Sequence, residues 1–91
     1  MARTVHHNQA AHKFELVEDN LTSIVEYELD GQVMDITHTI VPDAVGGRGI
    51  AGDLNKEALN TARQNGWKVK ATCPYTAAYI KRHPEFQDLL A

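Results

Sequence analysis

Four glycines around one arginine give this sequence its clearest sign of chemistry. Gly46, Gly47, Gly49 and Gly52 surround Arg48, and an amphipathic pattern begins directly after them. Glycines let a backbone approach a ligand closely, and the first amides of a helix lack carbonyl partners within that helix. Because the helix dipole adds partial positive charge there, the stretch predicts a phosphate or diphosphate site. A tight strand-to-helix connection that binds no ligand fits the same residues.

The single cysteine is the next candidate. Cys73 lies between a short strand pattern and a helical pattern that opens with Pro74. A helix start lowers the pKa of a thiol and exposes it, so Cys73 is a candidate base and, less readily, a nucleophile. The alternative is an inert buried cysteine, since free cysteines are often core residues.

His38 is the second candidate base, because imidazole titrates in the useful range. Its strand pattern places it on one face with three apolar residues, Met34, Ile36 and Ile40, and places Asp35, Thr37 and Thr39 on the other, outward face. The alternative is a core or sheet-face histidine that is hydrogen-bonded to backbone. His6, His7 and His12 do not predict a metal site, since adjacent histidines on an extended chain point to opposite faces and no cysteine lies near them.

Alternating residues predict the strands that precede the glycines. Segments 13–17, 22–29 and 32–41 have a period of two and form an antiparallel meander, with turns at Asp19-Asn20 and Asp30-Gly31. Residues 1–11 carry little pattern. The side chains expected to face the core from the first two strands are Phe14, Leu16, Val25, Tyr27 and Leu29.

After the glycines the period changes to about 3.6. The apolar stripe of this helix is formed by Ile50, Ala51, Leu54, Ala58, Leu59 and Ala62. Asn65-Gly66 ends the helix, and segment 67–72 returns as a strand, which implies a right-handed parallel connection. A second helix covers 75–81, and one or two helical turns from Pro84 pack Phe86, Leu89 and Leu90 back on the domain. The sequence predicts an α+β fold, a sheet covered by two helices.

Composition narrows the class of protein. The chain of 91 residues suits one domain, and a net charge of −3 with nine scattered Lys and Arg weighs against nucleic-acid binding. No apolar run approaches the roughly 20 residues that span a bilayer, and the start lacks the apolar core of a signal peptide. With one cysteine no internal disulfide can form, so we expect a reducing cytoplasm.

Two segments of the chain resemble a known family. Gly46-Gly47-Arg48-Gly49-Ile50-Ala51 is followed by Cys73-Pro74-Tyr75, Tyr79-Ile80 and Arg82-His83-Pro84-Glu85-Phe86. Together they resemble the GNAT superfamily of acetyl-CoA-dependent N-acetyltransferases, and more narrowly its small single-domain branch, the N-acetyltransferase domain-containing protein group. The resemblance runs from about Phe14 to Leu89.

The resemblance implies that the turn binds the diphosphate of acetyl-CoA. It also implies that the strand ending at Ile40 and Val41 splays from the strand at Val69–Thr72, with the pantetheine arm in the opening. Backbone amides near Ile40 and Val41 would polarise the thioester carbonyl. Including the turn and the segment after the cysteine, the implied cofactor residues are Ile40, Val41, Gly46, Gly47, Arg48, Gly49, Ile50, Ala51, Gly52, Pro74, Tyr75 and Arg82.

Tyr79 is similar in placement to the tyrosine with which many GNAT members protonate the leaving thiolate, although a packing aromatic is the alternative. The chain departs from the family at Gly46, where Gln or Arg is usual, and it shows no helices ahead of the meander, so we expect an open acceptor side. The resulting hypothesis is an N-acetyltransferase acting on an unidentified amine. The alternatives are a CoA- or acyl-CoA-binding module with little catalysis and a cofactor-free interaction domain.

Overall fold

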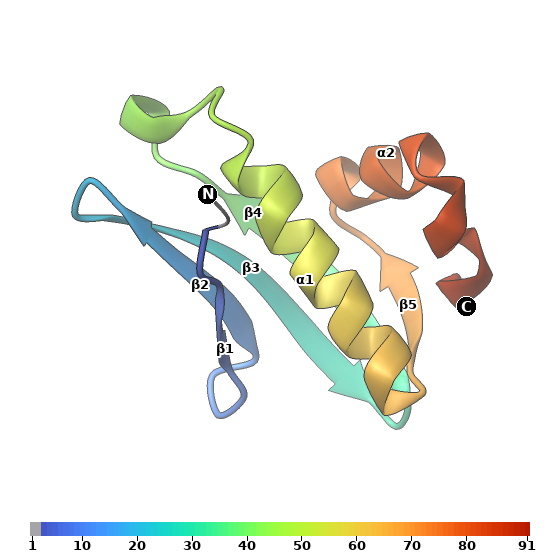
Figure 1. Cartoon of the computed structure of the whole chain (residues 1–91). Helices are drawn as coiled ribbons and strands as arrows, with labels where there is room; N and C mark the ends of the chain where they lie inside the picture. Colours follow the sequence, from blue (N-terminus) through green and yellow to red (C-terminus); the bar gives the residue numbers. More distant parts are fainter. Residues whose placement is uncertain (1–2) are drawn as a thin grey trace.

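In the computed structural model, which describes residues 3–91, five strands form one sheet in the order β1-β2-β3-β4-β5 (Figure 1). Neighbouring strands from β1 to β4 are antiparallel, and β5 is parallel to β4. The mostly antiparallel sheet with a parallel returning strand is therefore confirmed. The strands are β1 (His6–Asn8), β2 (Lys13–Glu18), β3 (Leu21–Asp30), β4 (Val33–Ile40) and β5 (Lys68–Ala71).

Helix α1 (Ile50–Asn65) connects β4 to β5 and lies across one face of the sheet (Figure 1). Helix α2 (Pro74–Arg82) follows β5 and packs beside the first turns of α1. Two short 3-10 helices complete the chain, η1 (Asp43–Val45) before α1 and η2 (Pro84–Leu89) after α2. This is the predicted α+β class. Among residues 3–91, no helix combines the length and apolarity that a membrane span requires.

The apolar stripe of α1 packs on the inward side chains of the sheet. Ile50, Leu54, Ala58, Leu59 and Ala62 are buried as predicted, together with Phe14, Leu16, Val25 and Tyr27 of β2 and β3. Ala51 and Leu29, predicted for the same core, are partly buried. The helix ends where the sequence places its end. Gly66 adopts φ 71° and donates its backbone N–H to carbonyls of the last helical turn, which is the usual role of a left-handed glycine at a C-terminus.

Strand β1 is missing from the sequence prediction, which found little pattern in residues 1–11. His7 accounts for its position: the imidazole Nε2 lies 2.6 Å from the Tyr27 hydroxyl, and the ring stacks on Phe14 with centroids 4.2 Å apart. Burial lowers the pKa of His7. A strand of three residues is too short for alternation to reveal it, and its stabilising contacts come from residues distant in sequence.

A β-bulge interrupts β4. Glu26 pairs with His38, but the next residue of β3, Tyr27, pairs with Ile36, so Thr37 is an extra residue on β4. An extra residue in one strand inverts the faces of everything that follows it, because side chains alternate with a period of two.

The bulge makes the predicted face of β4 wrong beyond its midpoint. Met34 and Ile36 are buried as expected, whereas His38 and Ile40 are exposed on the opposite face of the sheet. Thr39, predicted to point outward, instead points toward the helices. Thus His38 is not a core histidine.

Two smaller predictions also need correction. The hairpin at Asp30-Gly31 is shifted by one residue, because Asp30 still pairs with Val33 and only Gly31 has a positive φ. At the C-terminus Phe86 and Leu89 are buried as predicted, but Leu90 is 45% exposed. The other hairpin is confirmed, with Asp19 and Asn20 at φ 55° and 62°.

Candidate functional site

The candidate site lies where β4 and β5 separate. Their pairing runs from Val33 and Lys68 to Ile36 and Ala71, and the Cys73 amide then donates to the Ile36 carbonyl at 2.8 Å. Beyond this point β4 continues to Ile40 without β5 beside it. This pairing matches the splayed strands that the resemblance implies.

The glycine turn leads into α1 with an uncapped helix start. Gly47 and Gly49 adopt φ 78° and 85°, a conformation that other residues rarely take. Gly49 is the N-cap residue, and no side chain of residues 3–91 makes a capping hydrogen bond there. The amides of the first helical turn are therefore directed away from the helix without a cap, as a phosphate site requires.

Arg48, predicted to bind phosphate, is held by carboxylates of the β2–β3 hairpin. Its guanidinium lies 2.7 Å from Asp19 and 3.0 Å from Glu18, and it also donates to the Ala44 carbonyl. The hydrogen bonds to Asp19 and then to Glu18 raise the pKa of Arg48. In this arrangement Arg48 contacts acidic side chains, and the helix-start amides are left to supply the positive potential.

Arg3 also binds residues of the β2–β3 hairpin and of the start of α1, a role that the sequence did not suggest. Its guanidinium donates to the carboxylates of Glu18 and Asp53 and to the backbone carbonyl of Arg48, each at 2.8 Å. Hence the residues before β1, the β2–β3 hairpin and the start of α1 are joined by ion pairs. No pattern in residues 1–11 could have indicated this, because the partners lie 15 to 50 residues away.

Cys73 stands at the N-cap of α2 and is 4% exposed. Its sulfur lies 3.4 Å from the Thr39 hydroxyl of β4. Burial alone raises the pKa of Cys73, but the hydrogen bond with Thr39 and the amides and hydroxyl at the start of α2 outweigh it and lower the pKa overall. The thiol is thus buried and still more acidic than usual.

Three polar residues around Cys73, namely Thr39, Asn55 and Thr76, were not predicted as site residues from the sequence. Asn55 and Thr76 are fully buried, and Asn55 bonds to Thr39 at 3.2 Å and to Thr76 at 2.5 Å. The sequence does carry a sign of Asn55: it follows Ala51 by four residues, so a polar amide stands in the apolar stripe of α1. The sequence carries no such sign of Thr39, because only the bulge at Thr37 turns it toward the helices.

His38 does not join Cys73. The bulge places it on the opposite face, where its Nδ1 lies 3.1 Å from the Thr37 hydroxyl and 3.7 Å from the Glu26 carboxylate. With an exposed side chain on the uncovered face, it is badly placed to exchange a proton with the site. Ile40 is 50% exposed, and Val41 packs partly against the core.

The tyrosines of α2 face the start of α1. A Cβ built on Gly52 would lie 3.5 Å from the Tyr75 hydroxyl and 3.7 Å from the Tyr79 ring. Tyr79 also stacks on His83 with centroids 4.0 Å apart, and burial raises its pKa, so it keeps its proton near neutral pH. The structure thus brings both predicted tyrosines to the glycine turn. Pro74 begins α2, and Arg82 is exposed at its far end.

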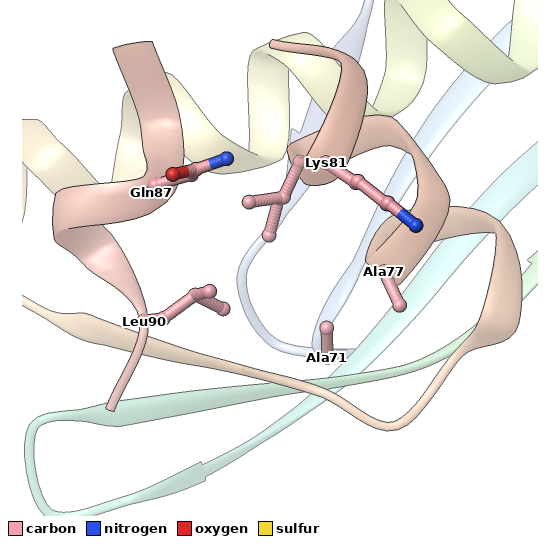
Figure 2. Close-up of a pocket in the computed structure, with 6 residues that line it drawn as sticks. Ala71, Ala77, Lys81, Gln87 and Leu90 are labelled. Carbon is pink, nitrogen blue, oxygen red and sulfur yellow. The ribbon is translucent and has the colours of Figure 1, made fainter. Parts of the chain in front are cut away.

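A separate hollow of about 270 Å³ lies between β5, α2 and η2. Figure 2 shows Ala71, Ala77 and Leu90 pointing toward a shared space. The lining is mostly apolar and is made by Ala71, Ala77, Ile80, Lys81, Gln87 and Leu90, none of which was predicted for catalysis or cofactor binding. Among residues 3–91, no group of three or more His, Cys, Asp or Glu side chains is arranged to hold a metal ion.

Comparisons with known proteins agree with this geometry. A family model described as GCN5-related N-acetyltransferase matches residues 13–89. Protein NATD1 of Gallus gallus is 41% identical over 63 residues, which cover 68% of this chain and 57% of that protein. Protein NATD1 of Danio rerio is 35% identical over 68 residues, covering 74% of this chain and 62% of that protein. The chain therefore spans little more than half the length of the first of these relatives.

A solved structure shares the whole fold. The solution NMR structure of a protein from Staphylococcus aureus, described as GCN5-like, superimposes with a TM-score of 0.76 at 26% identity. The match covers 100% of this chain and 91% of that one.

Proposed function

Because the chain belongs to the GCN5-related N-acetyltransferase (GNAT) family, we propose that it transfers an acetyl group from acetyl-CoA to an amine by direct attack in a ternary complex. One observation carries the proposal: the uncapped start of α1, the tyrosines of α2 and the acidic Cys73 thiol meet where β4 and β5 separate. The acceptor amine is unassigned.

The residues at the start of α1 suit a diphosphate. Gly47 and Gly49 hold left-handed backbone conformations, and within the described part of the chain no side chain caps the amides that follow. Uncapped amides with the helix dipole behind them favour an anion. Arg48 would add charge only after leaving Glu18 and Asp19, so we assign the main binding role to the amides of Ile50, Ala51 and Gly52.

Two side chains supply proton chemistry in this proposal. When bound, acetyl-CoA provides the thioester, and the amine must lose a proton as its nitrogen bonds to the carbonyl carbon. Cys73 Sγ can take up such a proton in its thiolate form, which the hydrogen bonds from Thr39 and the start of α2 favour by lowering the pKa. Tyr79 has a raised pKa and can supply a proton to a leaving thiolate. His38 has no part in this proposal, since it lies on the opposite face.

The first experiment is a titration of ¹⁵N-labelled protein with CoA. We expect saturable shifts of the amides from Gly49 to Gly52, and shifts confined to the distant hollow around Ala77 would contradict the assigned site. The second experiment measures consumption of acetyl-CoA with a panel of amines in the native chain and in Cys73→Ala and Tyr79→Phe. We expect turnover in the native chain and a loss of 10-fold or more, of the order of general acid-base catalysis, in at least one variant.

A CoA-binding module with little catalysis is the second candidate. The observation that favours it is the position of His38, which leaves no imidazole of residues 3–91 assigned to the site. Saturable CoA binding with no turnover for any amine would support this candidate over the first. If the protein does not bind CoA at physiological concentrations, the remaining candidate is a cofactor-free protein-interaction domain.

A further inference from the structure

Four side chains from three elements form a buried polar cluster next to the separating strands. Thr39 comes from β4, Asn55 from α1, and Cys73 and Thr76 from the start of α2. Asn55 and Thr76 are 0% exposed and Cys73 is 4% exposed. Buried polar groups are stable only when they are hydrogen-bonded, so the position of each proton in this cluster can be worked out from its partners.

The Ala51 carbonyl fixes the orientation of the Asn55 amide. A carbonyl can only accept, and it lies 2.9 Å from one terminal atom of the Asn55 side chain, which must therefore be Nδ2. The second proton of Nδ2 points to the Thr39 hydroxyl oxygen at 3.2 Å. Oδ1 then accepts the hydroxyl proton of Thr76 at 2.5 Å.

With the Asn55 amide in this orientation, the hydroxyl proton of Thr39 is the one that can be donated to the Cys73 sulfur. Thr76 has a single hydroxyl proton, and Asn55 accepts it. Thr39 accepts from Asn55 and so keeps its own proton free, with its oxygen 3.4 Å from Cys73 Sγ. A rotation of that hydroxyl changes Thr39 from acceptor of the S–H to donor toward S⁻, and no heavy atom has to move.

The bulge in β4 is what makes this arrangement possible. Thr37 is the extra residue, and it turns Thr39 from the exposed face to the helix side of the sheet. Without the extra residue His38 would occupy the inward position, and the neighbour of Cys73 would be an imidazole. The groups that lower the pKa of Cys73 are neutral: the hydroxyls of Thr39 and Thr76 and the backbone amides of Thr76 and Tyr75.

We propose that Thr39, oriented by Asn55, is a positioning residue that donates its hydroxyl hydrogen bond to the thiolate of Cys73 and accepts the S–H when the sulfur is protonated. The sulfur of Cys73 then keeps a hydrogen-bond partner in both of its protonation states. The benefit to acetyl transfer rests on the proposed function, but the hydrogen bond itself does not. The lowered pKa of Cys73 agrees with this assignment.

The test uses the single cysteine as its own probe. The full chain is labelled with [3-¹³C]cysteine, and the one Cβ resonance is followed against pH without CoA in the native protein, Thr39→Val and Thr39→Ser. Because hydrogen bonds to charged groups are strong, we expect the titration midpoint to rise by about one pH unit or more in Thr39→Val. Thr39→Ser restores the hydroxyl and should titrate close to the native protein.

Thr76→Val is the matched control, since it removes the second hydroxyl that lowers the pKa of Cys73, whose one proton is donated to Asn55. It should shift the midpoint less than Thr39→Val. An equal or larger shift in Thr76→Val, or an unchanged midpoint in Thr39→Val, overturns the proposal. If Thr39→Val does not fold, the native protein still decides, because a midpoint at or above that of an ordinary thiol also overturns it.

The outcome is independent of the proposed function. Loss of the Thr39 effect leaves CoA binding at α1 untouched, and failure to bind CoA leaves the thiol titration unchanged.

Discussion

Two clusters on opposite sides of the start of α1 hold polar residues in contrasting ways. The buried cluster (Thr39, Asn55, Cys73 and Thr76) is made of uncharged side chains, of which three are buried and Thr39 is partly buried. The surface ion cluster (Arg3, Glu18, Asp19, Arg48 and Asp53) is charged and partly open to solvent. Asp53 and Asn55 are two residues apart on the same helix, yet each belongs to a different cluster.

The contrast shows which part of the site is rigid and which can rearrange. Removing one member of a buried network leaves its partners unpaired, which is expensive. Exposed ion pairs contribute little and weaken in salt, so their members can change partners. We therefore expect the thiol side of the site to be fixed and the phosphate side to adapt on binding.

Asn55→Ala should give the largest effect. It removes the amide partner of the fully buried Thr76 hydroxyl and of the partly buried Thr39 hydroxyl, and we expect the free energy of unfolding to fall by about 2–4 kcal/mol. Urea denaturation followed by circular dichroism measures this loss.

Asn65→Ala is the matched control for that experiment. Asn65 lies on the same helix and makes the same bond to the carbonyl four residues earlier, from Nδ2 to Thr61 O at 2.8 Å, but it is exposed. Its replacement should cost less than about 1 kcal/mol, since water can satisfy the carbonyl. Equal losses in the two variants would show that the buried cluster is not a network.

The sequence predicted the local features of the site and missed most of the partners that complete each cluster. The glycine turn, the start of α1 and the position of Cys73 follow from residue type and local spacing. Thr39 and His38 were assigned to the wrong faces, because one extra residue at Thr37 inverts the alternation and no local composition marks a bulge. The ion pairs of Arg3 depend on partners far away in the chain, so they became visible only in the folded structure.

Gly49→Ala should have the next largest effect. A Cβ at φ 85° is strained, and we expect about 1–2 kcal/mol of destabilisation together with weaker CoA binding, because the strain displaces the uncapped amides. Urea denaturation and CoA titration measure the two effects.

Gly66→Ala separates strain from binding. Gly66 has φ 71° and terminates the other end of the same helix, so its replacement carries a similar strain far from the phosphate side. It should lose stability without losing CoA affinity. A parallel loss of affinity in both variants would mean that general destabilisation, and not the helix start, explains the first result.

Releasing Arg48 should have a smaller effect, of opposite sign. The double variant Glu18→Gln with Asp19→Asn removes both carboxylates that hold the guanidinium, so Arg48 becomes available to a phosphate. We expect CoA affinity to rise by up to about fivefold at low salt, the scale of an exposed charge pair, and the gain to shrink in high salt.

Asp88→Asn is the control for this release, since it frees Arg63 from a comparable exposed pair at the other end of the helix. It should not change CoA affinity. A double variant that binds CoA no better than the native chain would remove Arg48 from the binding residues.

Acid should break the ion pairs of the surface ion cluster and leave the buried cluster unchanged. We expect this to be the smallest of the predicted effects on stability. Hydrogen bonds from Arg3 and Arg48 lower the pKa of Glu18 below its usual 4.5. A depressed pKa stabilises the fold above the unfolded value, and this stabilisation is lost as the pH falls through the folded value. The urea midpoint of the native chain should therefore approach that of Glu18→Gln below about pH 4.5.

The side-chain amide of Asn55 gives the matching readout, because the buried cluster contains no carboxylate. Its NMR signals should stay constant between pH 6 and the acid transition, roughly pH 4, while the Nε signals of Arg3 and Arg48 move with the protonation of Glu18. Movement of the Asn55 signals with the same midpoint would mean that the two clusters are coupled through the first turns of α1. The phosphate side could then not rearrange without disturbing the environment of Cys73.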